Sequence, residues 1–191
     1  MKKRLLSLLL ALVMVVGMLP TTVLAAQPAA PATVPEGLSE NTGGSWDGES
    51  YDVSWYNTTD KEFTISDSAQ LAGLARLTNG TAEGVTGAVS FSGTTVKLGA
   101  DVSLGGMTWT SIGSFAGTFD GQGHTVSGLA GSALFKLLNS AGTIKNLTVD
   151  GAITTDKNYV AALVGTMNAN TKLLNCVNRA SVTGSDTAAG L

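Results

Sequence analysis

Side chains that could take part in metal or nucleophilic chemistry are scarce in this sequence. His124 is the only histidine and Cys176 is the only cysteine among the 191 residues. A zinc site or a Cys–His pair would therefore need further ligands or partners of other types, and no His-Glu-x-x-His sequence is present. We expect no metal, no cofactor and no catalytic residue in this chain.

Carboxylates are the other candidate group, because enzymes that cleave polysaccharides use a pair of them, or a calcium cluster with a basic residue. The candidates are Asp101, Asp120 and Asp150, and none lies in a local cluster of acidic residues. Arg179 stands 29 residues after Asp150, so the acid is not repeated there. We predict that the chain is not an enzyme. The alternative is a polysaccharide-binding or polysaccharide-cleaving protein whose active part is weak or missing here.

His124 has a structural interpretation besides a chemical one. It follows the sequence Asp120-Gly121-Gln122-Gly123. The two glycines permit positive φ, and an aspartate readily caps a turn. We therefore predict a turn in which Asp120 is the capping residue.

A helix and many short strands must position these residues. Tyr51, Val53 and Trp55 alternate with polar residues and predict a strand, as do Phe63 and Ile65. Exposed aromatic side chains can also stack on sugars, so glycan binding is an alternative to packing for this segment. The aromatic candidates for glycan binding are Trp46, Tyr51, Trp55 and Tyr56.

One helix is predicted from the sequence. It should begin near Asp67 or Ser68 as N-cap and end at Asn79-Gly80, with Leu71, Leu74 and Ala75 on one stripe. A single amphipathic helix ahead of many strands indicates a cap over one end of the β structure.

The remainder is predicted to be continuously paired β structure. The chain has 24 glycines, and no proline follows Pro35. Proline removes a ladder hydrogen bond, so its absence from a long stretch favours paired strands. After Gly93 the predicted strands lie near residues 96–98, 102–104, 117–119, 126–129 and 134–138.

A repeat in the last third predicts how these strands are arranged. Residues 144–147 match 173–176, residue 153 matches 182 and residues 133–135 match 162–164, all at an offset of 29, while Leu163 recurs as Leu191 at offset 28. A fixed period of about 20–50 residues is typical of a solenoid. Because the period contains strands and no helix, a β-solenoid is predicted.

The repeat also assigns structural roles to three residues. Cys176 occupies the position of Leu147, so we interpret it as a buried small hydrophobe rather than a reactive thiol. Asn146 and Asn175 are equivalent, and successive rungs lie about 4.8 Å apart, which allows their amides to bond in a ladder.

Several runs are similar to a known family. They are residues 63–65, 70–75, 96–101, 109–113 and 115–126, which includes Phe-Asp-Gly-Gln-Gly-His, together with 162–165 and 174–176. These runs resemble GLUG-motif bacterial surface proteins, a right-handed parallel β-helix family of Gram-positive bacteria. The resemblance implies a right-handed parallel β-helix and an adhesin-like surface role, and it covers about residues 46–191. Lys136 and Ala162 stand where the family motif usually has glycine.

The N-terminus predicts export. Lys2, Lys3 and Arg4 precede an apolar run over residues 5–19 that ends at Pro20. This run is shorter than the ~20 apolar residues that a spanning helix needs, so it favours a signal peptide over the alternative of an uncleaved anchor. We place the cleavage between Ala25 and Ala26 and expect no membrane insertion afterwards.

The net charge of the chain without its leader limits the classes of partner that we expect. Without its three basic leader residues the chain keeps 8 basic and 14 acidic residues, a net charge of −6. Nucleic acids and anionic membranes are bound mainly through basic patches, so we expect no nucleic acid partner. A host or cell-surface glycan or protein is the predicted partner class.

These observations predict a mainly β protein: signal peptide 1–25, linker 26–45, cap strands and helix 46–93, and parallel β-helix rungs 94–191, apparently truncated at the C-terminus. The predicted function is a secreted or cell-surface (extracellular) structural or adhesive module. A solenoid exposes a strand edge at each end, and such edges recruit other chains. We therefore expect self-association through the C-terminal rung, or fraying from about Ser181.

Overall fold

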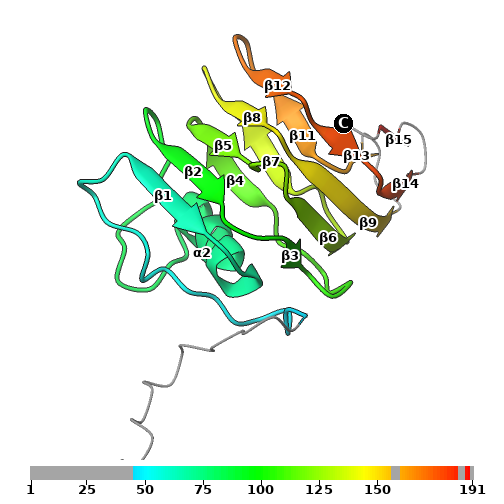
Figure 1. The fold of residues 1–191 in the computed structure, drawn as a ribbon, viewed down its shortest axis with the longest axis horizontal. Coiled ribbons are helices and arrows are strands. Elements are labelled where there is room, and N and C mark those ends of the chain that lie inside the picture. The colour runs from blue at the N-terminus through cyan, green and yellow to red at the C-terminus, as the bar shows by residue number, and fades with distance from the viewer. Residues whose placement is uncertain (1–44, 156–159, 185–187, 190–191) are drawn as a thin grey trace, which may run out of the picture. The chain divides into compact units, whose positions relative to one another are not determined.

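The computed structural model describes residues 45–155, 160–184 and 188–189 (Figure 1). The predicted signal peptide with its cleavage site at Ala25 and Ala26, most of the linker, and Leu191 lie outside these residues. The described part contains one helix, α2 (Ser68–Asn79). Its strands are β1 (Glu62–Ile65), β2 (Thr95–Leu98), β3 (Val102–Ser103), β4 (Ile112–Phe115), β5 (Thr118–Asp120), β6 (Thr125–Ala130), β7 (Phe135–Leu138), β8 (Thr143–Lys145), β9 (Thr148–Thr154), β10 (Val160–Ala161), β11 (Val164–Met167), β12 (Lys172–Leu174), β13 (Val177–Asn178), β14 (Ser181–Thr183) and β15 (Ala188–Ala189).

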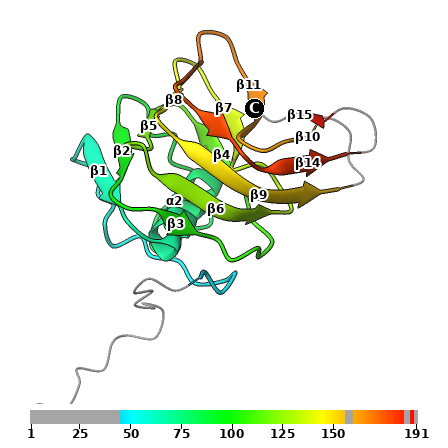
Figure 2. The same ribbon diagram turned by 45° about the vertical axis from the view of Figure 1, so that its right-hand side comes forward.

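The strands form parallel sheets that the chain visits in rotation. The first sheet has the order β1-β2-β5-β8-β12, the second β13-β9-β6-β3 with β14 also on β9, and the third β11-β7-β4. The paired strands run parallel, and β10 pairs with β15 in the same sense. Because the chain passes through β2, β3 and β4 and then repeats with β5, β6 and β7, it winds as a solenoid (Figure 2). The predicted mainly β, parallel solenoid is confirmed.

The core consists of columns of apolar side chains, one from each rung. In the first sheet the column is Phe63, Val96, Phe119, Ile144 and Leu173, each beside the next in register. The first four are buried and Leu173 is half-buried. Fully burying a side chain of this size contributes about 1.5–3 kcal/mol, so each added rung stabilises the columns further.

Aromatic rings bind the first rungs together. Phe115 lies 5.6 Å from Phe135 and 5.8 Å from Phe91, measured between ring centroids. Phe119 lies 5.2 Å from Phe135 in an edge-to-face arrangement. Such pairs add about 0.5–1.5 kcal/mol beyond their buried area. These ring contacts therefore join the first sheet to the third.

The predicted helix is confirmed with its caps. Asp67 is the N-cap, and its Oδ1 accepts a hydrogen bond from the Gln70 backbone N–H at 2.8 Å. Gly80 ends the helix with φ of 70°, a left-handed conformation that glycine adopts without a Cβ penalty. Asp67 therefore caps the helix through a hydrogen bond, and Gly80 ends it through its backbone conformation.

Helix α2 lies against β4, the outermost strand of the third sheet on the N-terminal side. Thr78 Oγ1 accepts a hydrogen bond from the Gly113 backbone N–H at 2.8 Å, and Asn79 Nδ2 donates to the Ser111 carbonyl at 2.9 Å. The buried stripe of the helix contains Leu71, Leu74, Ala75 and Leu77. The helix thus covers that edge where a further strand would otherwise pair.

The strand predicted from Tyr51, Val53 and Trp55 is wrong. This segment has no strand, because its polar groups bond locally: Trp55 Nε1 donates to the Asp52 carbonyl at 2.9 Å. Asp52 also donates its backbone N–H to the Ala69 carbonyl at 2.8 Å. The segment lies so close to the helix that a Cβ on Gly73 would be 1.9 Å from the Asp52 carbonyl oxygen. The alternation of Tyr51, Val53 and Trp55 with polar residues therefore reflects packing against the helix and not a strand.

The 29-residue repeat is confirmed where it was predicted. Leu173 lies beside Ile144, and Val182 lies beside Ile153. Earlier rungs are shorter, with 25 residues from β5 to β8 and 23 from β4 to β7. Successive turns therefore differ in length while their strands stay in register. No helix in the described ranges is long and apolar enough to cross a membrane.

Candidate functional site

An ordered ladder of polar side chains crosses three rungs of the first sheet's edge. Asn175 Nδ2 donates to Asn146 Oδ1 at 3.0 Å, and Asn146 Nδ2 donates to Asp120 Oδ1 at 3.0 Å. Asn146 and Asn175 have φ of 52° and 51°, in the left-handed region that asparagine tolerates better than most residues. The predicted pair of asparagines therefore sits at equivalent turns, and Asp120 extends the ladder by one rung.

Asp120 anchors this ladder as a buried carboxylate, only 5% exposed. Burial by itself would raise the pKa of Asp120, but hydrogen bonds from Asn146, the Gln122 backbone and Lys145, together with the positive charge of Lys145, lower it overall. Lys145 Nζ lies 3.0 Å from Asp120 Oδ2. The Gln122 backbone N–H bonds to Asp120 Oδ1 at 3.0 Å, as expected of a capping residue. Its partners assign Asp120 a structural role.

The turn before His124 differs in detail from the expectation. Positive φ occurs at Gln122 and Gly123, not at Gly121. Gly121 is required for a different reason, because a Cβ there would lie 2.5 Å from the Asn146 carbonyl oxygen on the next rung. His124 Nδ1 lies 3.1 Å from Asp101 Oδ1 at the surface. The pKa of Asp101 is lowered, first by the hydrogen bond from the Thr125 backbone N–H and then by the hydrogen bond with His124 and the charge of His124.

The three candidate carboxylates do not converge. Asp101 follows β2, Asp120 ends β5 in the first sheet, and Asp150 lies in β9 of the second sheet. Asp101 and Asp150 are exposed, whereas Asp120 is buried. Within the described ranges no group of three or more His, Cys, Asp or Glu side chains is placed to hold a metal ion.

The prediction that Cys176 is buried is wrong in degree. Its counterpart Leu147 is 1% exposed, whereas Cys176 is half-buried because it lies on the outermost rung of the first two sheets. Burial raises the pKa of the Cys176 thiol, and hydrogen bonding with the backbone of Leu147 and Leu174 offsets part of that rise. The thiol therefore stays protonated at neutral pH.

The aromatic side chains near the N-terminus pack inward. Trp46 is 5% exposed, and Trp55 lies 5.4 Å from Phe63 between ring centroids. Tyr56 is 5.6 Å from Phe91. Tyr51 is also partly buried against the core, with the Arg76 guanidinium 5.0 Å from its ring centroid, so the four candidate aromatic residues do not form an exposed stacking platform.

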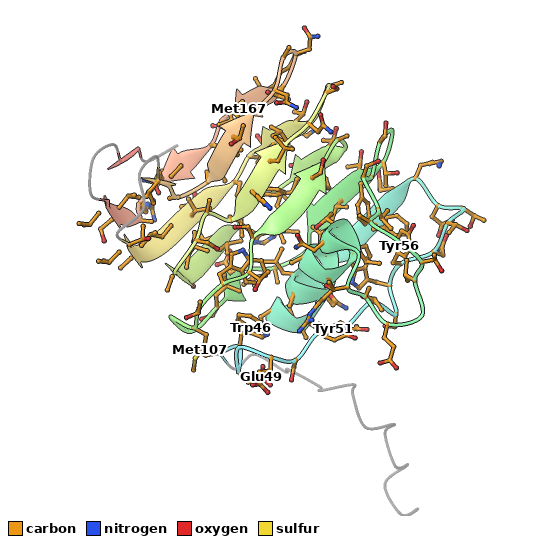
Figure 3. All side chains as sticks on the ribbon, turned by 180° about the vertical axis from the view of Figure 1, so that it is seen from behind. Trp46, Glu49, Tyr51, Tyr56, Met107 and Met167 are labelled. Atoms are coloured by element: carbon orange, nitrogen blue, oxygen red, sulfur yellow. The ribbon has the colours of Figure 1, made fainter. Side chains whose placement is uncertain are left out.

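A pocket of about 430 Å³ opens between helix α2 and two loops, and no sequence motif indicated it. Its lining residues come from three separate segments of the chain: Trp46, Gly48 and Glu49; Ala72, Ala75, Arg76, Asn79 and Thr81; and Trp109 and Thr110. Figure 3 shows Trp46, Glu49 and Tyr51 on the same side of the molecule as the helix, far from Met167. Since no segment contributes a recognisable pattern alone, only the fold reveals this site.

Apolar side chains are exposed along the opposite edge. We call strands β11, β12, β13 and β14 the C-terminal edge, because each is the outermost described strand of its sheet on that side. Met167, Leu174 and Val177 on this edge are 43%, 48% and 45% exposed. Met107, in the loop after β3, is 45% exposed. Among the residues that the structure describes, three of the four large exposed hydrophobic side chains thus lie on this edge.

The fold and these surfaces define a parallel β-solenoid module with a helix at one edge. In comparisons with known proteins, part of the chain is similar to halomucin of Haloquadratum walsbyi, with 36% identity over 85 residues, which is 41% of this chain and 1% of that protein. The chain therefore corresponds to a very small part of halomucin. No family model and no solved structure matches the chain.

Proposed function

We propose that this chain is a secreted or cell-surface structural module of the GLUG type, without catalytic activity, that extends a solenoid through its C-terminal edge. The observation that carries the proposal is the way the core columns end. Leu138 is fully buried on β7, yet its in-register neighbour Met167 on β11 is 43% exposed. The same change occurs from Leu147 to Cys176. The columns thus offer apolar surface to one more rung.

The edge is also suited to strand addition. An outer strand of a sheet can pair with a strand from another chain, and exposed charges are the usual means of preventing it. Lys172 on β12 is exposed and disfavours pairing there, whereas Met167 on β11 and Val177 on β13 carry no charge and leave those two strands open to it. We therefore propose that a second copy of this chain pairs with the C-terminal edge. Apart from this pairing, the proposed partner of the module is a host or cell-surface glycan or protein.

Two further observations support a non-catalytic surface role. The candidate carboxylates lie apart, and the buried one is fully engaged with Lys145 and Asn146. The similarity to part of halomucin, whose name places it with the mucins, fits an extracellular protein. The leader sequence fits export in the same way, and intact mass of protein recovered from the medium tests it. A mass that still includes residues 1–25 would contradict the export proposal.

Light scattering over a concentration series tests the proposed association. The chain should gain mass as its concentration rises, and Met167→Lys and Val177→Lys should each remain monomeric. Met107→Lys is the matched control, because Met107 is equally exposed but lies on the other side of the molecule (Figure 3). A monomeric wild-type chain at high concentration, or equal effects of all three variants, would contradict the proposal.

A further inference from the structure

The pocket beside helix α2 combines features of a small-molecule site. Ligand sites are typically ~300–1,000 Å³ in volume, mostly apolar, with a few polar groups that fix orientation. At about 430 Å³ this pocket falls in that range, and Ala72 and Ala75 provide a small apolar floor. Trp46 and Trp109 contact each other edge to face with centroids 5.4 Å apart, so one wall is rigid.

The positively charged side chain of Arg76 lies at this pocket. The guanidinium of Arg76 lies 5.0 Å from the centroid of the Tyr51 ring, which favours one orientation of the side chain. Within the described ranges Arg76 forms no ion pair, although the chain as a whole has more acidic than basic residues. A planar guanidinium pairs best with a carboxylate, which it binds through two parallel hydrogen bonds.

Polar groups around the cation suit hydroxyl groups. Asn79 also lines the pocket, but its Nδ2 bonds to the carbonyls of Ala75 and Ser111 and its Oδ1 lies beside Gly113, so it helps to hold the pocket wall. Glu49 and Thr110 are exposed and also line it. A ligand with one carboxylate and several hydroxyls matches this set better than a simple anion or a purely apolar molecule.

We propose that this pocket binds an acidic saccharide, with its carboxylate on Arg76 and its hydroxyls on Glu49 and Thr110. The indole N–H groups of Trp46 and Trp109 donate to the carbonyls of Ser50 and Leu134 at 2.8 and 3.1 Å. Both tryptophans are buried and line the pocket, so they shape its wall. This site is separate from the C-terminal edge.

Titration of the full chain with D-glucuronate, followed through the indole N–H signals in NMR spectra, tests the proposal. The signals of Trp46 and Trp109 should shift, whereas that of Trp55, which does not line the pocket, should stay. Glucuronate should bind about tenfold more tightly than D-glucose, because glucose lacks the charge-assisted pair with arginine. Acetate, which lacks the hydroxyls, should bind more weakly than glucuronate.

Variants separate the role of Arg76 from general charge. Arg76→Gln should abolish the preference for glucuronate over glucose, and Arg76→Lys should keep part of it. Arg179→Gln is the matched control, since it removes an exposed arginine away from the pocket and should change nothing. The proposal is overturned if glucose or acetate binds as tightly as glucuronate. It is also overturned if no indole signal shifts, or if Arg179→Gln has the effect expected of Arg76→Gln.

Discussion

Asn175 donates a hydrogen bond from Nδ2 to Oδ1 of Asn146 at 3.0 Å, one full rung apart, and both residues have positive φ. Asn146 makes the same kind of bond to Asp120 on the preceding rung. A single residue type thus satisfies two requirements at this turn, because asparagine tolerates the left-handed conformation and its amide is both donor and acceptor. The turns of neighbouring rungs are held in register by side chains as well as by the backbone.

The ladder predicts a graded loss of stability. Asn146→Ala removes two hydrogen bonds of about 0.5–1.5 kcal/mol each and leaves alanine in a left-handed conformation that costs about 1–2 kcal/mol, so we expect a loss of about 2–5 kcal/mol. Asn175→Ala removes only one side-chain bond to the ladder and should cost less. Asn146→Gly accepts positive φ and loses only the two hydrogen bonds, so in urea unfolding it should cost less than Asn146→Ala. Equal losses for Asn146→Ala and Asn175→Ala would show that the bond from Asn146 to Asp120 contributes nothing.

The buried carboxylate of Asp120 predicts sensitivity to acid. Because the pKa of Asp120 is lowered in the folded state, its stabilisation is present above its ordinary value of 3.8 and is lost as the pH falls through the folded value. Asp120→Asn should therefore lower the free energy of unfolding at pH 7 and flatten its dependence on pH below about 4. Asp150→Asn, at an exposed site, is the control. Parallel pH profiles for wild type and Asp120→Asn would contradict this role.

Close packing of the segment near Asp52 predicts that Gly73→Ala destabilises the protein. The added Cβ would lie 1.9 Å from the Asp52 carbonyl oxygen, so the segment must move away from the helix. Overpacking of this kind costs about 1–3 kcal/mol. Gly165→Ala is the comparison, because its nearest atom would be 3.1 Å away. The thermal unfolding midpoint should fall clearly for Gly73→Ala and little for Gly165→Ala; the reverse order would be incompatible with this packing.

Partial burial predicts intermediate reactivity for Cys176. Its raised pKa keeps the thiol protonated at neutral pH, and the side chain is only partly accessible to solvent. Labelling by a thiol reagent should be slow in the folded chain, faster in denaturant, and faster at higher pH in both. Equal rates in the folded and unfolded chain would contradict the position assigned to this residue.

Much of the fold follows from local sequence signals. The helix caps at Asp67 and Gly80 were predictable because each satisfies a specific backbone requirement. The repeat at offset 29 was predictable because β12 and β14 keep the apolar positions of β8 and β9. Earlier rungs carry different side chains at spacings of 23 and 25 residues, so no fixed period revealed them.

The rest depends on contacts between distant segments. Tyr51 and Trp55 alternate with polar residues as in a strand, but the helix beneath them and the local bond to Asp52 determine their conformation. The pocket joins Trp46, Arg76 and Trp109, which are far apart in sequence. Neither periodicity nor spacing contains that information.

Hydrogen exchange at two protein concentrations tests most directly whether the C-terminal edge binds a further rung. If a second copy pairs with this edge, amides in residues 172–183 should gain protection as the concentration rises, while those of β5 inside the solenoid stay unchanged. Val177→Lys should remove the gain. Protection of residues 172–183 that does not depend on concentration would contradict extension of the solenoid through this edge.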